Sequence, residues 1–220
     1  MAEHNIPDRH AVALITVDLQ RDFVCQGSPV QGSGVQAALP HISHILQAFR
    51  ALKKPIFHAV RLYRPDGSNV DLCRRSAVEE GLRVLMPGTS GAELIDAVKP
   101  DPALRLEADA LLEGEFQKLR TDEFVFYKPR WSGFFRTALE EKLKEREINT
   151  LVICGINFPT GGRATIFDAS ARDFRVMIGS NALSDAKEDA LRELGRIGVY
   201  QMTAEALVEW LNGDRRAPAT

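Results

Sequence analysis

The sequence lacks the features that mark several common classes of protein. Its three cysteines, Cys25, Cys73 and Cys154, fit neither a disulfide scaffold nor a structural zinc site in number or spacing. Lys and Arg total 28 against 30 Asp and Glu, so no basic field attracts nucleic acid. No apolar run approaches the roughly 20 residues of a membrane span, and residues 1–10 lack the apolar core of a secretory signal. We expect a cytoplasmic protein that binds neither nucleic acid nor membranes.

Histidine is also scarce, and its positions argue against a metal. The five histidines end at His58, and only His41 and His44 lie one helical turn apart, without a third ligand. The glycines Gly155, Gly161 and Gly162 do not fit the G-x-G-x-x-G pattern of dinucleotide-binding proteins. The sequence therefore predicts no catalytic metal and no cofactor.

The residues that are present predict one α/β domain over residues 1–220, with loose termini at 1–10 and 214–220. With 45% hydrophobic residues, the chain can bury a substantial core. Short apolar runs rich in Val, Ile and Phe alternate with helical patterns, which is typical of repeated β-α units. The expected fold is a Rossmann-like three-layer sandwich with a mostly parallel six-stranded sheet and helices on both faces. Its strands lie near 11–17, 56–62, 124–127, 151–154, 175–179 and 199–202.

Helices are expected between these strands, with three segments left without one. Apolar residues at three- and four-residue spacing predict a helix from near Pro40 to Leu52, and similar patterns predict helices within 135–148 and from near Thr160. A closing helix begins at Thr203 and is capped by Gly213. The polar, turn-rich segments 64–75 and 85–94 are interpreted as loops over a pocket mouth, and residues 95–122 as irregular.

Chemistry-bearing residues stand where three of the strands end. In a parallel sheet, ligands bind beyond the carboxyl ends of the strands, and Asp18, Lys128 and the turn 155–162 all fall there. Asp18 leaves an apolar strand, where partial desolvation would make it a usable proton carrier. Lys128 could pair with it and attract an anion. Taken alone, an aspartate in such a place is more often a turn or cap residue, and a lysine is more often a surface residue.

The three contexts together resemble the isochorismatase-like hydrolases, also called the cysteine hydrolase superfamily. The segments are DLQRDF around Asp18, KPRWSGFF around Lys128, and CGINFPTGGRATIFDASARDFRV. The usual triad of that family is Asp, Lys and Cys, and the resemblance places Gly161 at the position of the nucleophilic cysteine. Cys25, Cys73 and Cys154 offer no obvious substitute, although Cys25 lies only seven residues beyond Asp18. The metal-binding histidines of the nicotinamidases within this family have no match here.

Isochorismatases proper also carry glycine at this position, so the resemblance implies a small-molecule hydrolase that acts without a covalent cysteine. In this hypothesis Asp18 protonates a vinyl ether as general acid, Lys128 supports it, and backbone N–H groups around Thr160–Gly162 receive negative charge. Two alternatives remain open. The chain could be a catalytically degenerate ligand-binding relative, or a C–N amidohydrolase whose cysteine is replaced by Gly161.

Other residues near the three motifs are predicted to line the substrate site, with a pocket wall or ordinary packing as the simpler explanation for each. The substrate is expected to be anionic, or to carry an amide or an enol ether. The resemblance also implies a homodimer or homotetramer and a non-proline cis peptide near Ile156–Asn157. The predicted substrate-binding residues are Gln20, Phe23, Arg61, Trp131, Asn157, Phe158, Thr160 and Gly162.

Overall fold

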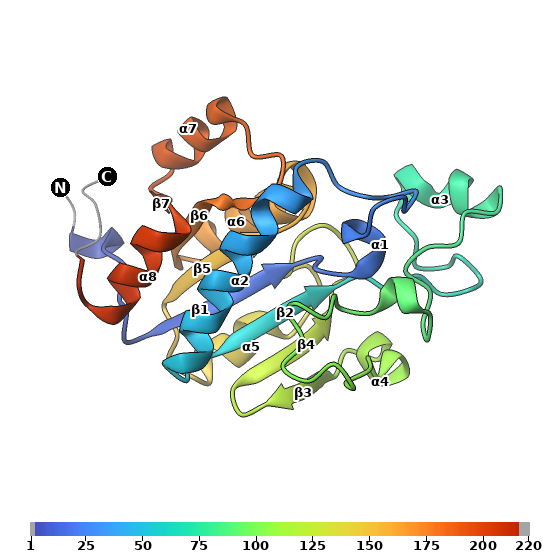
Figure 1. Ribbon diagram of the computed structural model, residues 1–220, viewed down its shortest axis with the longest axis horizontal. Helices are drawn as coiled ribbons and strands as arrows, with labels where there is room; N and C mark the ends of the chain where they lie inside the picture. Colours follow the sequence, from blue (N-terminus) through green and yellow to red (C-terminus); the bar gives the residue numbers. More distant parts are fainter. Residues whose placement is uncertain (1–2, 216–220) are drawn as a thin grey trace.

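A twisted seven-stranded sheet forms the centre of the protein in the computed structural model, which describes residues 3–215 (Figure 1). All neighbouring strands are parallel except the pair β3 and β4. In spatial order the strands are β3 (Phe116–Arg120), β4 (Glu123–Tyr127), β2 (Ile56–Val60), β1 (Val12–Val17), β5 (Thr150–Gly155), β6 (Arg175–Leu183) and β7 (Tyr200–Met202). The central strands are buried on both faces, which explains why they read as continuous apolar runs.

Helices cover both faces of the sheet and give the expected three layers (Figure 1). One face packs against α2 (Val35–Ala51) and α8 (Ala204–Asn212), and the other against α5 (Leu139–Lys144), α6 (Arg163–Ser170) and α7 (Glu188–Arg196). The remaining helical elements are η1 (Glu3–Asn5), α1 (Arg21–Val24), α3 (Leu72–Glu79), η2 (Ser90–Ala92), α4 (Ala108–Leu112) and η3 (Phe158–Gly162). The α/β prediction is confirmed, and none of the described helices is long and apolar enough to cross a membrane.

The sheet has one strand more than predicted, because part of the segment interpreted as irregular is ordered. Residues 95–122 contain α4 and the antiparallel edge strand β3. This strand exposes Lys118 and Arg120 and buries the polar Gln117, whose amide bonds to main-chain groups of Arg105 and Glu107. A charged edge strand with a buried amide shows no apolar alternation, so the sequence pattern did not reveal it.

Two helix predictions also need correction. The helix α2 begins at Val35, after Gly34 in the left-handed conformation (φ 68°), and Pro40 lies inside it on the exposed side. Segment 64–75, predicted as a loop, includes the start of α3, whose residues are all at least partly exposed and therefore form no apolar stripe. The closing helix was predicted correctly, since Thr203 caps α8 at its N-terminus and Gly213 (φ 92°) caps its C-terminus.

The chain ends were expected to be loose. Within segment 3–10, the Asn5 side chain donates to the Gly198 carbonyl at 2.8 Å, and the Asp8 N–H donates to the Thr150 hydroxyl at 2.9 Å. These two bonds fasten the segment to the body of the domain. The expectation for residues 1–2 and 216–220 lies outside the described residues.

A buried polar network stabilises the sheet against α2. The ring of His58 lies 2.7 Å from the Thr16 hydroxyl through Nδ1 and 3.0 Å from Glu123 Oε1 through Nε2. Arg50 of α2 donates to the same carboxylate at 2.6 Å. Burial alone would raise the pKa of Glu123, but the hydrogen bonds from His58 and Arg50 outweigh it and lower the pKa to about 2. The network is therefore charged and internally satisfied at neutral pH.

Strand register brings the ends of β1, β2, β4 and β5 to one edge. Val17 pairs with Gly155 on one side and with Ala59 on the other, and Val60 pairs with Tyr127. Gly155 has a φ of 140°, and a Cβ there would lie 2.3 Å from the Val17 carbonyl oxygen, so only glycine fits. The residues that follow β1, β2 and β4, namely Asp18, Arg61 and Lys128, lie together at this edge.

Candidate active site

Asp18 and Lys128 form a buried ion pair at this edge. The Lys128 Nζ donates to Asp18 Oδ2 at 2.9 Å, and the two side chains are 0% and 5% exposed respectively. Each residue directly follows its strand, and its N–H is fixed by a carbonyl of β2, Ala59 for Asp18 and Val60 for Lys128. The predicted convergence of residues 110 positions apart in the chain is therefore present in the structure.

Burial makes the Lys128 ammonium a better proton donor than an ordinary lysine. Desolvation lowers its pKa, the nearby Asp18 carboxylate raises it, and the Arg61 charge lowers it again, which leaves a pKa of about 8. Because the two groups share a hydrogen bond, their protons belong to the pair rather than to either residue. The pair can thus give up a proton near neutral pH.

Asp18 combines a left-handed backbone conformation with an incompletely hydrogen-bonded carboxylate. Its φ is 58°, in the left-handed region that Asp and Asn tolerate better than most residues. Its Oδ1 is buried and has no hydrogen-bond partner among residues 3–215, while Oδ2 receives Lys128. An unsatisfied buried carboxylate oxygen costs free energy. Oδ1 is therefore the carboxylate oxygen that remains available for a hydrogen bond.

Gly161 occupies the third corner of the site. It lies in η3, a π-helical turn between β5 and α6, and it is buried. A Cβ built at Gly161 would lie 2.9 Å from Asp18 Oδ2, 3.0 Å from Val17 Cγ1 and 3.5 Å from the Trp131 carbonyl oxygen. The Asp18 carboxylate thus approaches the space that a side chain at 161 would need.

Arg61 follows β2 and lies between the ends of β1 and β4. Its guanidinium donates to the Lys128 carbonyl at 3.2 Å and pairs with Asp71. Tyr63 also donates to Asp71 Oδ2, at 2.8 Å. Burial opposes ionisation of Asp71, but the Arg61 hydrogen bond is among the effects that keep its pKa below the usual value. Arg61 was predicted as a substrate-binding residue, yet its charge is already matched by the Asp71 carboxylate.

Aromatic and cationic side chains cover this cluster. The Arg61 guanidinium lies 5.6 Å from the centre of the Trp131 ring, and the Arg74 guanidinium lies 5.3 Å from the same ring. Arg74 is also 5.6 Å from the Phe23 ring and donates to the Tyr63 hydroxyl at 2.9 Å. The two predicted residues Phe23 and Trp131 therefore border the site.

Gln20 and Asn157 hold the main chain around the site. The Gln20 amide donates to the Arg61 and Ala92 carbonyls and accepts from the Arg61 N–H, each at 2.7 Å. The Gln20 side chain is therefore hydrogen-bonded within the protein through both its amide nitrogen and its amide oxygen. Asn157 has a left-handed φ of 56°, and its N–H donates to the Ser184 hydroxyl at 2.8 Å. Both residues position their neighbours in this structure.

The remaining predicted residues belong to η3. Phe158 is 1% exposed and packs in the core on the α6 side, and Gly162 is buried at the start of α6. Thr160 is exposed, and its N–H donates to the Asn157 carbonyl at 3.0 Å, so it is not available to receive negative charge as expected. Residues 3–215 contain no cis peptide bond, which corrects the expectation at Ile156–Asn157.

Among residues 3–215, no hydrogen bond joins a cysteine to Asp18 or Lys128. Cys154 is buried inside β5, where desolvation raises its pKa to about 12 and keeps it a thiol. Cys25 and Cys73 are exposed, whereas Asp18 and Lys128 are not. Within the described range 3–215, no three His, Cys, Asp or Glu side chains are grouped so as to hold a metal ion.

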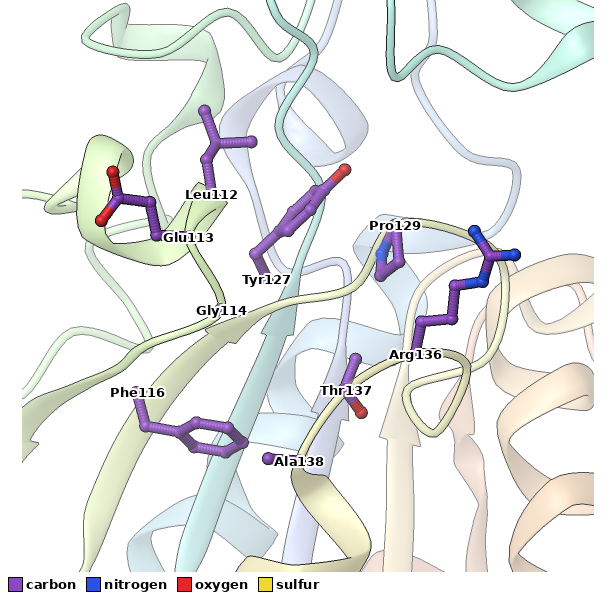
Figure 2. Close-up of a pocket in the computed structure, with 9 residues that line it drawn as sticks. All are labelled: Leu112, Glu113, Gly114, Phe116, Tyr127, Pro129, Arg136, Thr137 and Ala138. Carbon is purple, nitrogen blue, oxygen red and sulfur yellow. The ribbon is translucent and has the colours of Figure 1, made fainter.

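A separate cavity of about 310 Å³ lies beside the end of β4 (Figure 2). Tyr127 and Pro129, the neighbours of Lys128, line it together with Phe116 and Arg136, but Lys128 itself does not. In Figure 2 the charged ends of Glu113 and Arg136 point outward rather than toward each other. This cavity is therefore distinct from the space around the Asp18–Lys128 pair.

Three residues near the ion pair were not predicted from the sequence, namely Tyr63, Asp71 and Arg74. Asp71 and Arg74 lie in segment 64–75, which was interpreted as a loop, and Tyr63 directly precedes that segment. Asp71 precedes the first residue of α3, and Arg74 follows three positions later, so both can face the same side of one helical turn. That spacing was a usable signal, although the exposed character of α3 concealed the helix.

Comparisons with known proteins match most of the chain, including the segments that carry Asp18, Lys128 and Gly161. The family model for the isochorismatase domain matches residues 12–207. A probable inactive nicotinamidase from Arabidopsis thaliana is 28% identical over 86% of this chain and 87% of its own length. A ureidoacrylate amidohydrolase from Methylorubrum extorquens is 28% identical over 84% of this chain and 75% of its own length. The crystal structure of an isochorismatase family protein from Desulfovibrio vulgaris superposes with a TM-score of 0.78, at 29% identity, covering 92% of this chain and 98% of that one.

Proposed function

Because the chain belongs to the isochorismatase family, we propose that it is a small-molecule hydrolase that uses the Asp18–Lys128 pair without a covalent nucleophile. The main support for this proposal is the position of Asp18 Oδ2, which lies 2.9 Å from where a Cβ of residue 161 would stand. A site built around a carboxylate in this place suits proton transfer to the substrate. The reaction that fits best is cleavage of an enol ether, the type of bond found in isochorismate.

The first step of this reaction transfers a proton from the pair to the substrate. The pair holds one transferable proton, which rests on Lys128 in the ion pair and passes to Asp18 when the substrate binds. Oδ1 of Asp18 delivers this proton to the terminal methylene carbon of the enol ether, which leaves an oxocarbenium ion, the Asp18 carboxylate and a neutral Lys128 amine. Because burial lowers the pKa of Lys128 to about 8, the ammonium can give up its proton in this way near neutral pH.

The second step consumes one water molecule. Water adds to the oxocarbenium carbon and gives one proton back to the pair, which forms a hemiketal. The hemiketal then collapses, the C–O bond to the leaving alcohol breaks, and a ketone such as pyruvate is released. The net reaction is substrate plus water to alcohol plus ketone, and no bond to the protein forms. Gly161 leaves room for the substrate beside the carboxylate.

Two other functions remain in competition. The likeness to a probable inactive nicotinamidase supports a relative that binds a ligand without turning it over. The likeness to an amidohydrolase supports loss of a cysteine from an ancestral C–N hydrolase. The second alternative predicts that Gly161→Cys restores amide hydrolysis. The short distance from residue 161 to Asp18 speaks against a simple restoration, since Asp18 would have to move.

A pyruvate-release assay tests the proposal directly. Purified protein is incubated with isochorismate and other enolpyruvyl ethers, and pyruvate is followed with a coupled dehydrogenase. We expect turnover by the unmodified chain and a loss of at least about a hundredfold in Asp18→Asn, the usual contribution of a general acid. No pyruvate from any enol ether would overturn the enol-ether reaction, and undiminished turnover by Asp18→Asn would overturn the role of Asp18.

A further inference from the structure

The charged cluster around the ion pair consists of Asp18, Arg61, Asp71, Arg74 and Lys128, and one of its positive charges has no carboxylate partner. Lys128 is paired with Asp18 and Arg61 with Asp71. Among residues 3–215, Arg74 forms no ion pair, and its one side-chain hydrogen bond goes to the neutral hydroxyl of Tyr63. Three cations therefore face two carboxylates, and the balance of the cluster is one positive charge.

Partial burial strengthens the electrostatic attraction between the Arg74 charge and a bound anion. Arg74 is partly buried and lies between the Phe23 and Trp131 rings, at 5.6 and 5.3 Å from their centres. A charge in such a place is screened less by water than a surface arginine. Guanidinium groups also bind carboxylates with two parallel hydrogen bonds. The residue is thus equipped to bind one anionic group.

Arg74 is also placed where an entering molecule would pass. Lys128 and Asp18 are closed from solvent in this structure, so a substrate must displace a covering side chain. Helix α3, which carries Arg74, has no buried residue, and Leu72 at its start is 79% exposed. A segment with so few apolar contacts opens at little free-energy cost. Figure 1 shows α3 at the rim of the molecule, beyond the carboxyl ends of the strands.

We infer that Arg74 determines specificity by binding one carboxylate group of the substrate, in place of its hydrogen bond to Tyr63. The ring of Trp131 gives the flat part of such a substrate a surface on which to lie. Asp18 Oδ1, which has no hydrogen-bond partner among residues 3–215, then faces the remaining part of the substrate. This inference rests on the proposed function for the location of the site, but it concerns binding and not turnover.

Calorimetric binding of matched acid and amide pairs tests the inference separately from catalysis. The probes are benzoate with benzamide, and pyruvate with pyruvamide, each pair differing mainly in charge. We expect at least one acid to bind about tenfold or more tightly than its amide, the effect of one charge-assisted hydrogen bond. The variant Arg74→Gln should lose this preference.

The matched control is Arg75→Gln, the next residue of α3, which removes the same charge from the same exposed helix. It should keep the preference for the acid, and circular dichroism should show all variants folded. Equal binding of acid and amide, no binding of either acid, or a preference that survives Arg74→Gln would overturn the inference. Failure of the pyruvate-release assay alone would leave it standing, because binding is measured without turnover.

Discussion

Removing the Asp18 carboxylate should destabilise the protein in a way that depends on pH. The change Asp18→Asn keeps the side-chain shape and tolerates the positive φ of 58°. It leaves the Lys128 ammonium, 0% exposed, without its counter-charge. Loss of one partner of a buried ion pair costs about 3–5 kcal/mol. We expect the free energy of unfolding to fall by about that amount at pH 7.

The cost should shrink as pH rises, because a neutral Lys128 needs no counter-charge. Its pKa of about 8 already includes the attraction of Asp18, so in Asp18→Asn it should lose its proton at a lower pH still. Denaturant unfolding at pH 7 and pH 9.5 measures both values. The matched control is the double variant Asp18→Asn with Lys128→Met, which removes the charge as well and should recover most of the stability.

Two outcomes would refute this reasoning. If Asp18→Asn were as stable as the unmodified protein at pH 7, the pair would not be buried as the structure shows. If the double variant were as unstable as the single one, the cost would come from lost packing or hydrogen bonding and not from an unpaired charge. Both measurements are independent of substrate.

Three further predictions concern the same structure. Turnover (kcat/KM) should fall as pH rises through about 8, because the pair loses the Lys128 proton; a pH profile still rising at pH 9 would contradict this. Glu123 has a folded pKa of about 2 against an ordinary 4.5, so its contribution, about 3 kcal/mol, is present above pH 4.5 and lost as pH falls toward 2. Urea unfolding at pH 7 and pH 3 should show that loss, and Glu123→Gln should weaken it; equal pH dependence in both proteins would refute it. Amide hydrogen exchange should be much faster in α3 than in β5, and benzoate should slow it in α3; equal protection of the two elements would show that α3 does not open readily.

The parts of the fold that were predictable are those where one physical pattern dominates. Strands buried on both faces read as apolar runs, and a residue that follows such a strand must lie at the sheet edge, so Asp18 and Lys128 could be placed together. The helix α8 was predictable because Thr203 and Gly213 mark its two ends. In these places local and long-range preferences agree.

Other features depend on contacts that a sequence does not display. The strand β3 buries a glutamine that is satisfied by distant main chain, and α3 is held by polar contacts instead of an apolar stripe. The neutralisation of Arg61 by Asp71 could not be predicted, because Asp71 lies ten residues further along the chain, beyond an exposed turn. The sequence could name Arg61 as a cation near the site, but it could not show that the available charge lies on Arg74.

The order of the strands has a consequence for how the protein is made. The central strand β1 is synthesised early, yet its neighbour β5 begins only at Thr150. At about 5–20 residues per second, roughly 140 residues take about 7–28 s to emerge from the ribosome. During that interval the segment VALITV has an unpaired edge and is exposed to association with other chains. We expect nascent chains to need chaperones until β5 docks.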